Sequence, residues 1–334
     1  MTRAIAMYLP QYHPIELNNR IWGKGFTEWT NVTKAKPLFE GHYQPHYPAD
    51  LGYYDLRIAE VRKQQARMAA DYSIEGFCYY HYWFGSAGYE LTRPLKAILK
   101  LKQPDYPFCL CWANQTWTGI WHGLENKILK KQDYPESKIQ TFVDSLLEIF
   151  EDKRYISVDS KPLFLIFRPL ELPKFFIEIL RNKANERGFP GIYILGVLHF
   201  QEIYKFDNYK KPFFKRLKDL ELKNLNPENY LLDGFVNSAL PLPIDQNARE
   251  IRVGPQIIDH ENIADLEIIQ NSKYENYPMV GNTFDNTPRC GRNGIVYVNS
   301  SPKLFKKQIE KAASVISNNE KSKQLLFIKS WNEW

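Results

Sequence analysis

The chain has 334 residues, of which 44% are hydrophobic, so it is long enough for one large barrel or for two ordinary domains. Lys and Arg number 44 against 38 Asp and Glu, and most of the basic residues are scattered along the chain. The exception is the stretch Lys205 to Lys223, which we interpret as a solvated face. We therefore expect no nucleic-acid partner. The N-terminus carries no apolar leader and no run approaches about 18 apolar residues, which predicts a cytoplasmic protein without a transmembrane segment.

Short, continuously apolar runs recur along the chain, as in buried parallel strands. In chain order they are Ala4–Leu9, Gly76–Tyr80, Phe108–Trp112, Pro162–Phe167, Ile192–Val197, Asp233–Val236, Pro278–Gly281 and Leu325–Ile328.

Helical periodicity lies between these runs, in Leu56–Tyr72, Glu136–Phe150, Phe175–Gly188 and Leu304–Ser317, with Gly188 at the C′ position that ends a helix. Strands that alternate with helices predict an α/β protein, and about eight of them in this length favour a single (β/α)8 TIM barrel over residues 1–334. A doubly wound open sheet is the alternative. No G-x-G-x-x-G follows the first run, which disfavours a dinucleotide-binding version of that sheet.

Cysteine and histidine spacing gives no sign of a metal site. Cys78, Cys109 and Cys111 sit inside apolar runs, and with Cys290 they form no paired C-x-x-C motif, so we expect buried free thiols. The histidines His13, His42, His46, His81 and His122 lack the spacing of known zinc or iron motifs. We therefore expect no metal and no cofactor.

Aromatic and amide side chains gather where four expected strands end. Because the active site of such a barrel lies at the carboxyl ends of its strands, these residues are candidates for substrate contact. The candidates are Tyr8, Gln11 and His13 after the first strand, Tyr80, His81 and Trp83 at the second, Trp112, Asn114 and Trp117 at the third, and Trp331 and Asn332 after the last. Together with an aromatic content of 15%, they indicate a sugar-binding cleft, and rings packed at the barrel rim are the alternative.

Glu333 is the most informative carboxylate, since it follows the last strand and lies between two tryptophans. Burial beside indole rings predicts a raised pKa, which suits an acid or base in glycosyl chemistry. The alternative is a glutamate that pairs with a nearby Lys or Arg.

Two loops carry further candidates. Glu28 and Trp29 follow two glycines in the long loop after the first strand, and this loop either contacts sugar or is purely structural. A phosphate-binding loop is disfavoured, because no Lys-Ser/Thr follows the glycines. Asp285 lies after the seventh strand, where it either contacts substrate or builds a turn with Asn286.

Seven segments of the chain resemble the glycoside hydrolase family 99-like proteins, which are often described as WbsX-type glycosyltransferases of lipopolysaccharide or O-antigen biosynthesis. These segments are Tyr8–Ile15, Gly23–Val32, Gly41–Arg57, Gly76–Phe84, Cys111–Thr118, Asn282–Arg289 and Ser330–Trp334. The resemblance runs from residue 3 to the last residue and implies a (β/α)8 barrel.

The resemblance also implies a mechanism. In the related endo-α-mannosidases, a Glu-Trp-x-Glu segment follows the last strand, and its first Glu deprotonates the sugar 2-hydroxyl, so that a 1,2-anhydro sugar forms. Its second Glu is the general acid. Glu333 falls on the first Glu, while the second would lie three positions later, beyond Trp334. We therefore expect a barrel truncated after its last strand. Either the chain is a fragment, and the second glutamate lies in the missing part, or the gene product is naturally truncated and lacks this acid.

Three functions remain open from the sequence. The first is an enzyme that cleaves or transfers an α-linked, mannose-like unit of a surface polysaccharide, with Glu333 as base. The second is a WbsX-type glycosyltransferase, although no Asp-x-Asp motif is present. The third is a non-catalytic carbohydrate-binding barrel, if the chain ends at Trp334. The expected partner is an oligosaccharide or polysaccharide, with peripheral association with membrane-bound polysaccharide assembly machinery as a further expectation.

Overall fold

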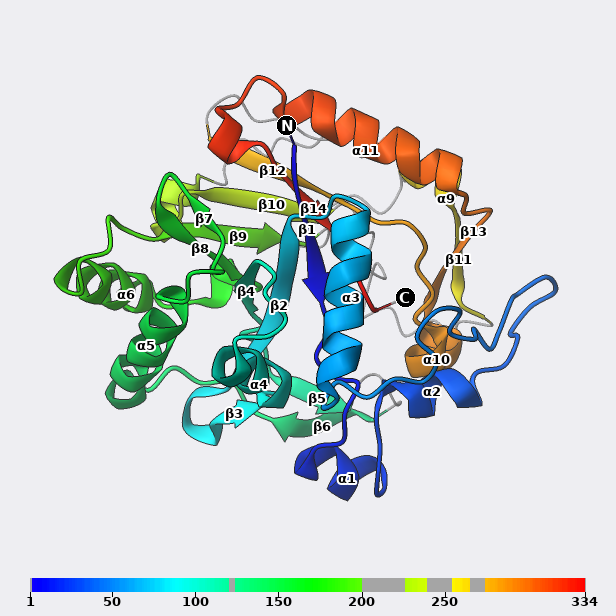
Figure 1. Cartoon of the computed structure of the whole chain (residues 1–334). Coiled ribbons are helices and arrows are strands. Elements are labelled where there is room, and N and C mark those ends of the chain that lie inside the picture. The colour runs from blue at the N-terminus through cyan, green and yellow to red at the C-terminus, as the bar shows by residue number, and fades with distance from the viewer. Residues whose placement is uncertain (1, 120–123, 200–225, 239–253, 265–273, 334) are drawn as a thin grey trace, which may run out of the picture.

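The computed structural model describes residues 2–119, 124–199, 226–238, 254–264 and 274–333. Eight parallel strands pair in the order β1, β14, β12, β10, β9, β8, β4 and β2, and β2 pairs again with β1, which closes the barrel (Figure 1). The barrel strands are β1 (Arg3–Tyr8), β2 (Gly76–Trp83), β4 (Phe108–Trp112), β8 (Lys161–Ile166), β9 (Tyr193–Leu198), β10 (Gly234–Ser238), β12 (Glu275–Val280) and β14 (Leu325–Ile328). The predicted (β/α)8 fold is confirmed, and each strand overlaps one of the eight expected runs.

Helices cover the outside of this barrel (Figure 1). The longer ones are α3 (Ala59–Asp71), α4 (Arg93–Leu101), α5 (Glu136–Phe150), α6 (Lys174–Glu186) and α11 (Pro302–Ile316). Four of them overlap the predicted helices, and α4 was not predicted. Pro94 lies in the first turn of α4, where a proline is tolerated.

Shorter elements lie in the connections. The helices are α1 (Glu16–Trp22), α2 (Glu28–Lys34), α9 (His260–Ala264) and α10 (Thr287–Cys290), and the strands are β3 (Tyr89–Glu90), β5 (Trp117–Gly119), β6 (Leu124–Lys130), β7 (Ser157–Val158), β11 (Gln256–Asp259) and β13 (Ile295–Val298). Single 3₁₀ turns occur at Gly85–Ala87, Pro169–Glu171, Pro227–Tyr230, Gly291–Asn293 and Lys321–Lys323. The basic stretch Lys205 to Lys223 and His122 lie outside the described residues.

Alternation along β2 sorts its side chains between the barrel interior and the surrounding helices. The rings of His81 and Trp83 stack on Phe142 of α5, with centroids 5.9 and 4.1 Å away. Tyr80 points to the other side, where its ring centroid lies 5.9 Å from that of Phe167, just after β8. Successive strand residues therefore face opposite sides of the sheet, as the pleat requires.

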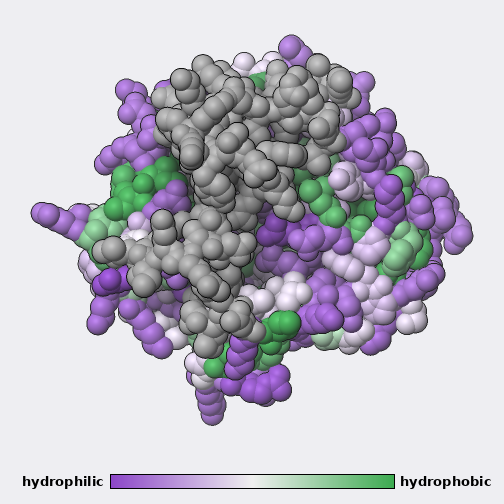
Figure 2. Space-filling view, turned by 180° about the vertical axis from the view of Figure 1, so that it is seen from behind, coloured by the Kyte–Doolittle hydropathy of each residue, from purple (hydrophilic) through white to green (hydrophobic). Residues whose placement is uncertain are grey.

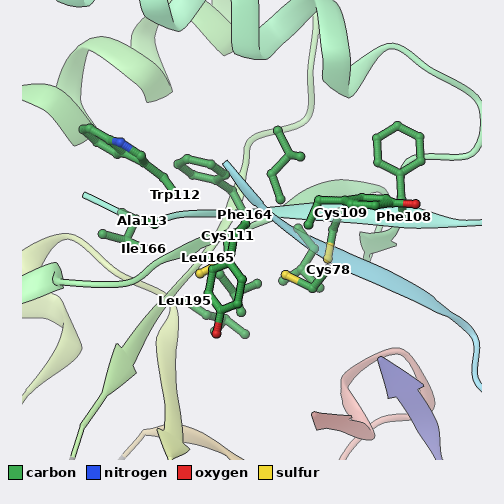
Figure 3. Close-up of a cluster of buried hydrophobic side chains, with 14 of the residues drawn as sticks. Cys78, Phe108, Cys109, Cys111, Trp112, Ala113, Phe164, Leu165, Ile166 and Leu195 are labelled. Atoms are coloured by element: carbon green, nitrogen blue, oxygen red, sulfur yellow. The ribbon is translucent and has the colours of Figure 1, made fainter. Parts of the chain in front are cut away.

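The neighbouring strand β4 shows the same division. Figure 3 shows Phe108 and Trp112 on one side of the strands and the thiols of Cys78 and Cys111 on the other. Cys78, Cys109 and Cys111 are free and fully buried, as predicted, whereas Cys290 is half-buried. In the barrel core these three cysteines behave as small apolar side chains.

In the view from behind, the part of the surface that carries hydropathy colours is mostly hydrophilic, and its hydrophobic residues form separate small areas (Figure 2). Among the residues that the structure describes, no helix has both the length and the apolar character needed to cross a membrane.

Candidate active site

Glu333 lies just beyond the carboxyl end of β14, in a turn bound to the end of β1. The side chain of Asn332 accepts a hydrogen bond from the Leu9 amide at 2.8 Å and donates one to the Leu9 carbonyl at 2.9 Å. The hydroxyl of Tyr12 donates to the carbonyl of Asn332 at 2.5 Å. These bonds span more than 300 residues of sequence, and they fix the backbone that carries Glu333.

Arg289 of α10 joins Glu333 to a second carboxylate. Its Nη1 lies 3.3 Å from Oε1 of Glu333, and its Nη2 lies 3.1 Å from Oε2 of Glu28. Glu28 is the first residue of α2, and α2 packs beside α10 (Figure 1). Burial opposes the charge on the guanidinium, but the two carboxylates outweigh this effect and raise the pKa of Arg289 above its ordinary value. Arg289 is therefore a permanent cation between two glutamates.

Two tyrosines on one face of β2 lie within the electrostatic influence of Glu333. Burial raises the pKa of both Tyr80 and Tyr82, and the negative charge of Glu333 raises it further. Both phenols therefore stay protonated and can donate hydrogen bonds. The ring of Tyr82 also meets that of Trp117 at 5.3 Å in an edge-to-face contact, which adds an indole beside the tyrosines. We call Glu28, Tyr80, Tyr82, Arg289 and Glu333 the Glu333 cluster.

Asp285 lies in the loop before α10 and binds a different segment of the chain. Its Oδ2 accepts hydrogen bonds from His42 Nε2 at 2.8 Å and from Gln44 Nε2 at 2.5 Å. Its Oδ1 accepts from the amide of Thr287 at 2.9 Å and from its hydroxyl at 2.6 Å. Because Nδ1 of His42 accepts a bond from the Leu38 amide at 3.0 Å, the imidazole is neutral and donates through Nε2. Asp285 is 5% exposed and ties the loop around His42 to the start of α10.

Two further candidates, Tyr8 and Trp29, are held by other side chains and by the backbone. The hydroxyl of Tyr8 donates to Gln65 of α3, so its ring faces that helix. The indole of Trp29 donates to the carbonyl of Tyr54 at 2.7 Å, and its ring lies 4.7 Å from that of Tyr12. Tyr8 therefore packs beside α3, and Trp29 packs against Tyr12, whose hydroxyl binds the Glu333 turn.

Three candidates at the second and third strands face the outer helices. His81 and Trp83 lie against α5, and Trp112 is fully buried, with its ring 4.7 Å from Phe176 of α6. The side chain of Asn114, also fully buried, accepts from the Arg168 amide at 2.7 Å and donates to the Arg168 carbonyl at 3.0 Å. Asn114 thus clamps the ends of β4 and β8 together.

The remaining candidates are also held by backbone or core contacts. The carbonyl of Gln11 accepts from the Glu28 amide at 3.4 Å. His13 is 1% exposed, and burial lowers its pKa to about 4. The amide of Trp331 donates to the Met7 carbonyl at 2.8 Å, and its ring lies 5.1 Å from that of Phe77 in the core.

The structure therefore brings Glu28, Tyr80 and Glu333 together and adds two residues that the sequence reasoning missed, Tyr82 and Arg289. Tyr82 lies two positions after Tyr80, which places it on the same face of the strand. Arg289 is the last residue of the segment Asn282–Arg289, which follows the seventh strand. The opposite charges of Arg289 and of the two candidate glutamates, Glu28 and Glu333, were the signal that could have predicted their contact. Within the described ranges, no three His, Cys, Asp or Glu side chains gather in a way that could hold a metal ion.

Comparison with known proteins gives the chain its relatives. It is similar to the uncharacterized protein WxcX of two strains of Xanthomonas campestris pv. campestris, with 32% identity over 338 residues. The match covers 99% of this chain and 46% of WxcX, so the chain spans about half the length of these curated relatives.

Solved structures share the fold. A glycoside hydrolase family 99 endo-alpha-mannosidase from Bacteroides thetaiotaomicron matches with TM-scores of 0.55 with bis-tris-propane and 0.53 without it, at 14% identity. These matches cover 99% of this chain and 84% or 85% of the mannosidase. A glycoside hydrolase-like protein matches with a TM-score of 0.52 at 13% identity, over 92% of this chain and 90% of its own. Such likeness shows the fold alone. The family model described as glycosyltransferase WbsX matches residues 4–334, and the chain therefore belongs to the WbsX glycosyltransferase family.

Proposed function

We propose that this chain is a carbohydrate-active enzyme of polysaccharide metabolism, in which Glu333 is a base toward a sugar hydroxyl. The observation that carries the proposal is the position of Glu333, which follows the carboxyl end of the last barrel strand and lies 3.3 Å from the guanidinium of Arg289. Enzymes with this fold place their catalytic groups at the carboxyl ends of the barrel strands. The WbsX family and the glycoside hydrolase neighbours support carbohydrate as the substrate class.

The proposed reaction begins when Glu333 takes the proton of the sugar 2-hydroxyl. The 2-oxygen then forms a bond to the anomeric carbon, while the bond from that carbon to the leaving oxygen breaks. A general acid must protonate the leaving oxygen, and the family position for this acid lies three residues after Glu333, beyond residue 334. Water then attacks the anomeric carbon and gives its proton to the deprotonated acid. The bond from that carbon to the 2-oxygen breaks, and Glu333 returns its proton to the 2-oxygen, which gives cleavage. A sugar hydroxyl that attacks in place of water gives transfer.

The finer assignments follow the relatives. An α-linked, mannose-like unit is the proposed substrate, because the solved neighbour is an endo-alpha-mannosidase. Transfer during the synthesis of a surface polysaccharide is the second candidate, favoured by the description of the matching family. Such a role would place the protein in the cytoplasm, at the periphery of the membrane-bound assembly machinery.

The test replaces Glu333 by Gln in the full-length gene product and follows α-mannose-linked oligosaccharides by mass spectrometry, with and without a sugar acceptor. Loss of the base should lower turnover by about 10²–10⁴-fold, while binding, measured by calorimetry, is kept. Glu186→Gln is the matched control, because Glu186 is exposed at the end of α6, where the helix reaches the opposite end of the barrel. Undiminished turnover by Glu333→Gln would refute the assignment, and binding without any turnover by the native protein would favour a non-catalytic barrel.

A further inference from the structure

Glu28 is poorly placed to touch a substrate directly. Its side chain is 1% exposed, and its Oε2 already accepts from Asn31 Nδ2 at 3.3 Å and meets the Arg289 guanidinium at 3.1 Å. A buried carboxylate is costly unless it is paired and hydrogen-bonded, and both conditions are met here. The role of Glu28 is therefore to be sought in what it does to Arg289 and, through Arg289, to Glu333.

The charges of Glu28 and Arg289 affect how readily Glu333 accepts a proton. An arginine that paired with Glu333 alone would favour its ionised form and make it a poor proton acceptor. Here the same guanidinium serves two carboxylates, so two negative charges face one positive charge. When Glu333 accepts a proton, the group becomes neutral overall, and the buried pair of Glu28 and Arg289 remains intact.

From this geometry we propose that Glu28 and Arg289 are positioning residues that keep Glu333 in place and make it a competent base. Arg289 fixes the direction of the Glu333 carboxylate through the contact at 3.3 Å. Glu28 shares the positive charge of Arg289, so that Glu333 is held without being locked in its charged form. This inference rests on the proposed role of Glu333 as the base.

The other groups on which the charge of Glu333 acts are neutral. Tyr80 and Tyr82 of β2 and Tyr12 after β1 are protonated phenols, because burial and nearby carboxylates raise their pKa values. Burial raises the pKa of Cys290, the neighbour of Arg289, to about 12, so this thiol is neutral. Glu28 and Arg289 are therefore the charged groups of α2 and α10 through which the basicity of Glu333 is set.

The experiment titrates Glu333 directly, by carbon NMR of the full chain labelled at the glutamate carboxyl carbon. The Glu333 signal is assigned by its loss in Glu333→Gln. In Glu28→Gln the pKa of Glu333 should fall by about one unit, because Arg289 then serves it alone. In Arg289→Gln the pKa should rise by about one unit, because the cation is lost while Glu28 remains.

If Glu28 and Arg289 had only a structural role, their variants would not shift the pKa of Glu333 in opposite directions. Two further variants test this interpretation. Arg289→Gln leaves a buried carboxylate unpaired and can fail to fold, so the double variant Glu28→Gln/Arg289→Gln removes both charges and should return the pKa of Glu333 toward its native value. Glu186→Gln should leave it unchanged. An unshifted or raised pKa in folded Glu28→Gln would overturn the proposal.

Kinetics separate this inference from the proposed function. If the enzyme turns over, Glu28→Gln should move the acidic limb of the kcat/KM profile to lower pH and reduce kcat, by at most about tenfold per pKa unit. If the titrations shift as expected but Glu333→Gln keeps full turnover, the pair still tunes Glu333, and it is the catalytic role of Glu333 that fails.

Discussion

Asp285 is a polar side chain whose bonding capacity is used within the protein. Its carboxylate accepts four hydrogen bonds, two from the segment around His42 and two from Thr287. Hydrogen bonds to a buried charge are stronger than those between neutral groups. Of the two interpretations that the sequence left open, the contacts favour the turn, since Thr287 binds Asp285 in the manner of a local turn.

Replacing Asp285 by Asn should destabilise the fold. An amide nitrogen would take the place of one oxygen and confront a donor, either from His42 and Gln44 or from Thr287. We expect a loss of about 2 kcal/mol in the free energy of unfolding, measured by urea denaturation. Asp50→Asn is the control, because Asp50 is exposed in the loop that carries His42 and Gln44, and its replacement should change stability little. Equal stabilities of the two variants would contradict this role for Asp285.

At the scale of the helices, some local sequence signals were sufficient to predict where an element ends. Helix α6 ends as predicted, because Gly188 has φ +86°, a left-handed conformation that suits glycine. Its amide donates to the Asn185 carbonyl at 3.0 Å, and the Phe189 amide donates to the Ala184 carbonyl at 3.0 Å. The last turn of the helix is thereby satisfied by backbone groups.

Gly188→Ala tests this C-cap. No other atom lies within 4 Å of the position that a Cβ would take, so the only cost is the strained backbone. We expect a loss of about 1 kcal/mol in unfolding free energy. Thermal and urea denaturation would measure it, with Glu186→Ala, an exposed change in the same helix, as the reference. A Gly188→Ala protein as stable as the reference would show that the left-handed turn relaxes without cost.

Strand alternation explains why neighbouring candidates face opposite sides of the sheet. Tyr80 and Tyr82 lie on one face of β2, whereas His81 and Trp83 lie on the other face, against α5. The sequence interpretation took all residues at a strand end as one group. It therefore did not separate the two faces of the strand, which alternate with a period of two residues. Trp112 pairs in register with His81 and accordingly faces the helices as well.

Across the whole molecule, buried histidines link stability to pH. Burial lowers the pKa of His13 and of His81 to about 4 in the folded protein, while an unfolded histidine titrates near about 6.5. Between these two values the unfolded chain binds protons that the folded chain does not. Stability is therefore lost as the pH falls from about 6.5 to about 4, and below that these groups add no further change.

His81→Phe should remove part of this dependence. Phenylalanine keeps a ring against Phe142 and has no proton to gain. Between about pH 6 and pH 5, the unfolding free energy of the native protein should fall more steeply than that of the variant, by at most about 1.4 kcal/mol per pH unit. Urea unfolding at several pH values measures both slopes. Parallel curves would mean that His81 titrates normally in the fold.

The sequence by itself determined the barrel, because each buried parallel strand needs a continuous apolar run and each covering helix an amphipathic one, and both are local patterns. It also pointed to Glu28, Tyr80 and Glu333, since the rule that strands end at one opening needs only the order of the elements. The tertiary structure alone decided that Arg289 lies between Glu28 and Glu333. That contact joins residues far apart in the chain, and it depends on the closure of β14 against β1 and on the packing of α2 against α10. Strand register and side-chain direction arise only when the barrel closes, and for this reason no local pattern contains them.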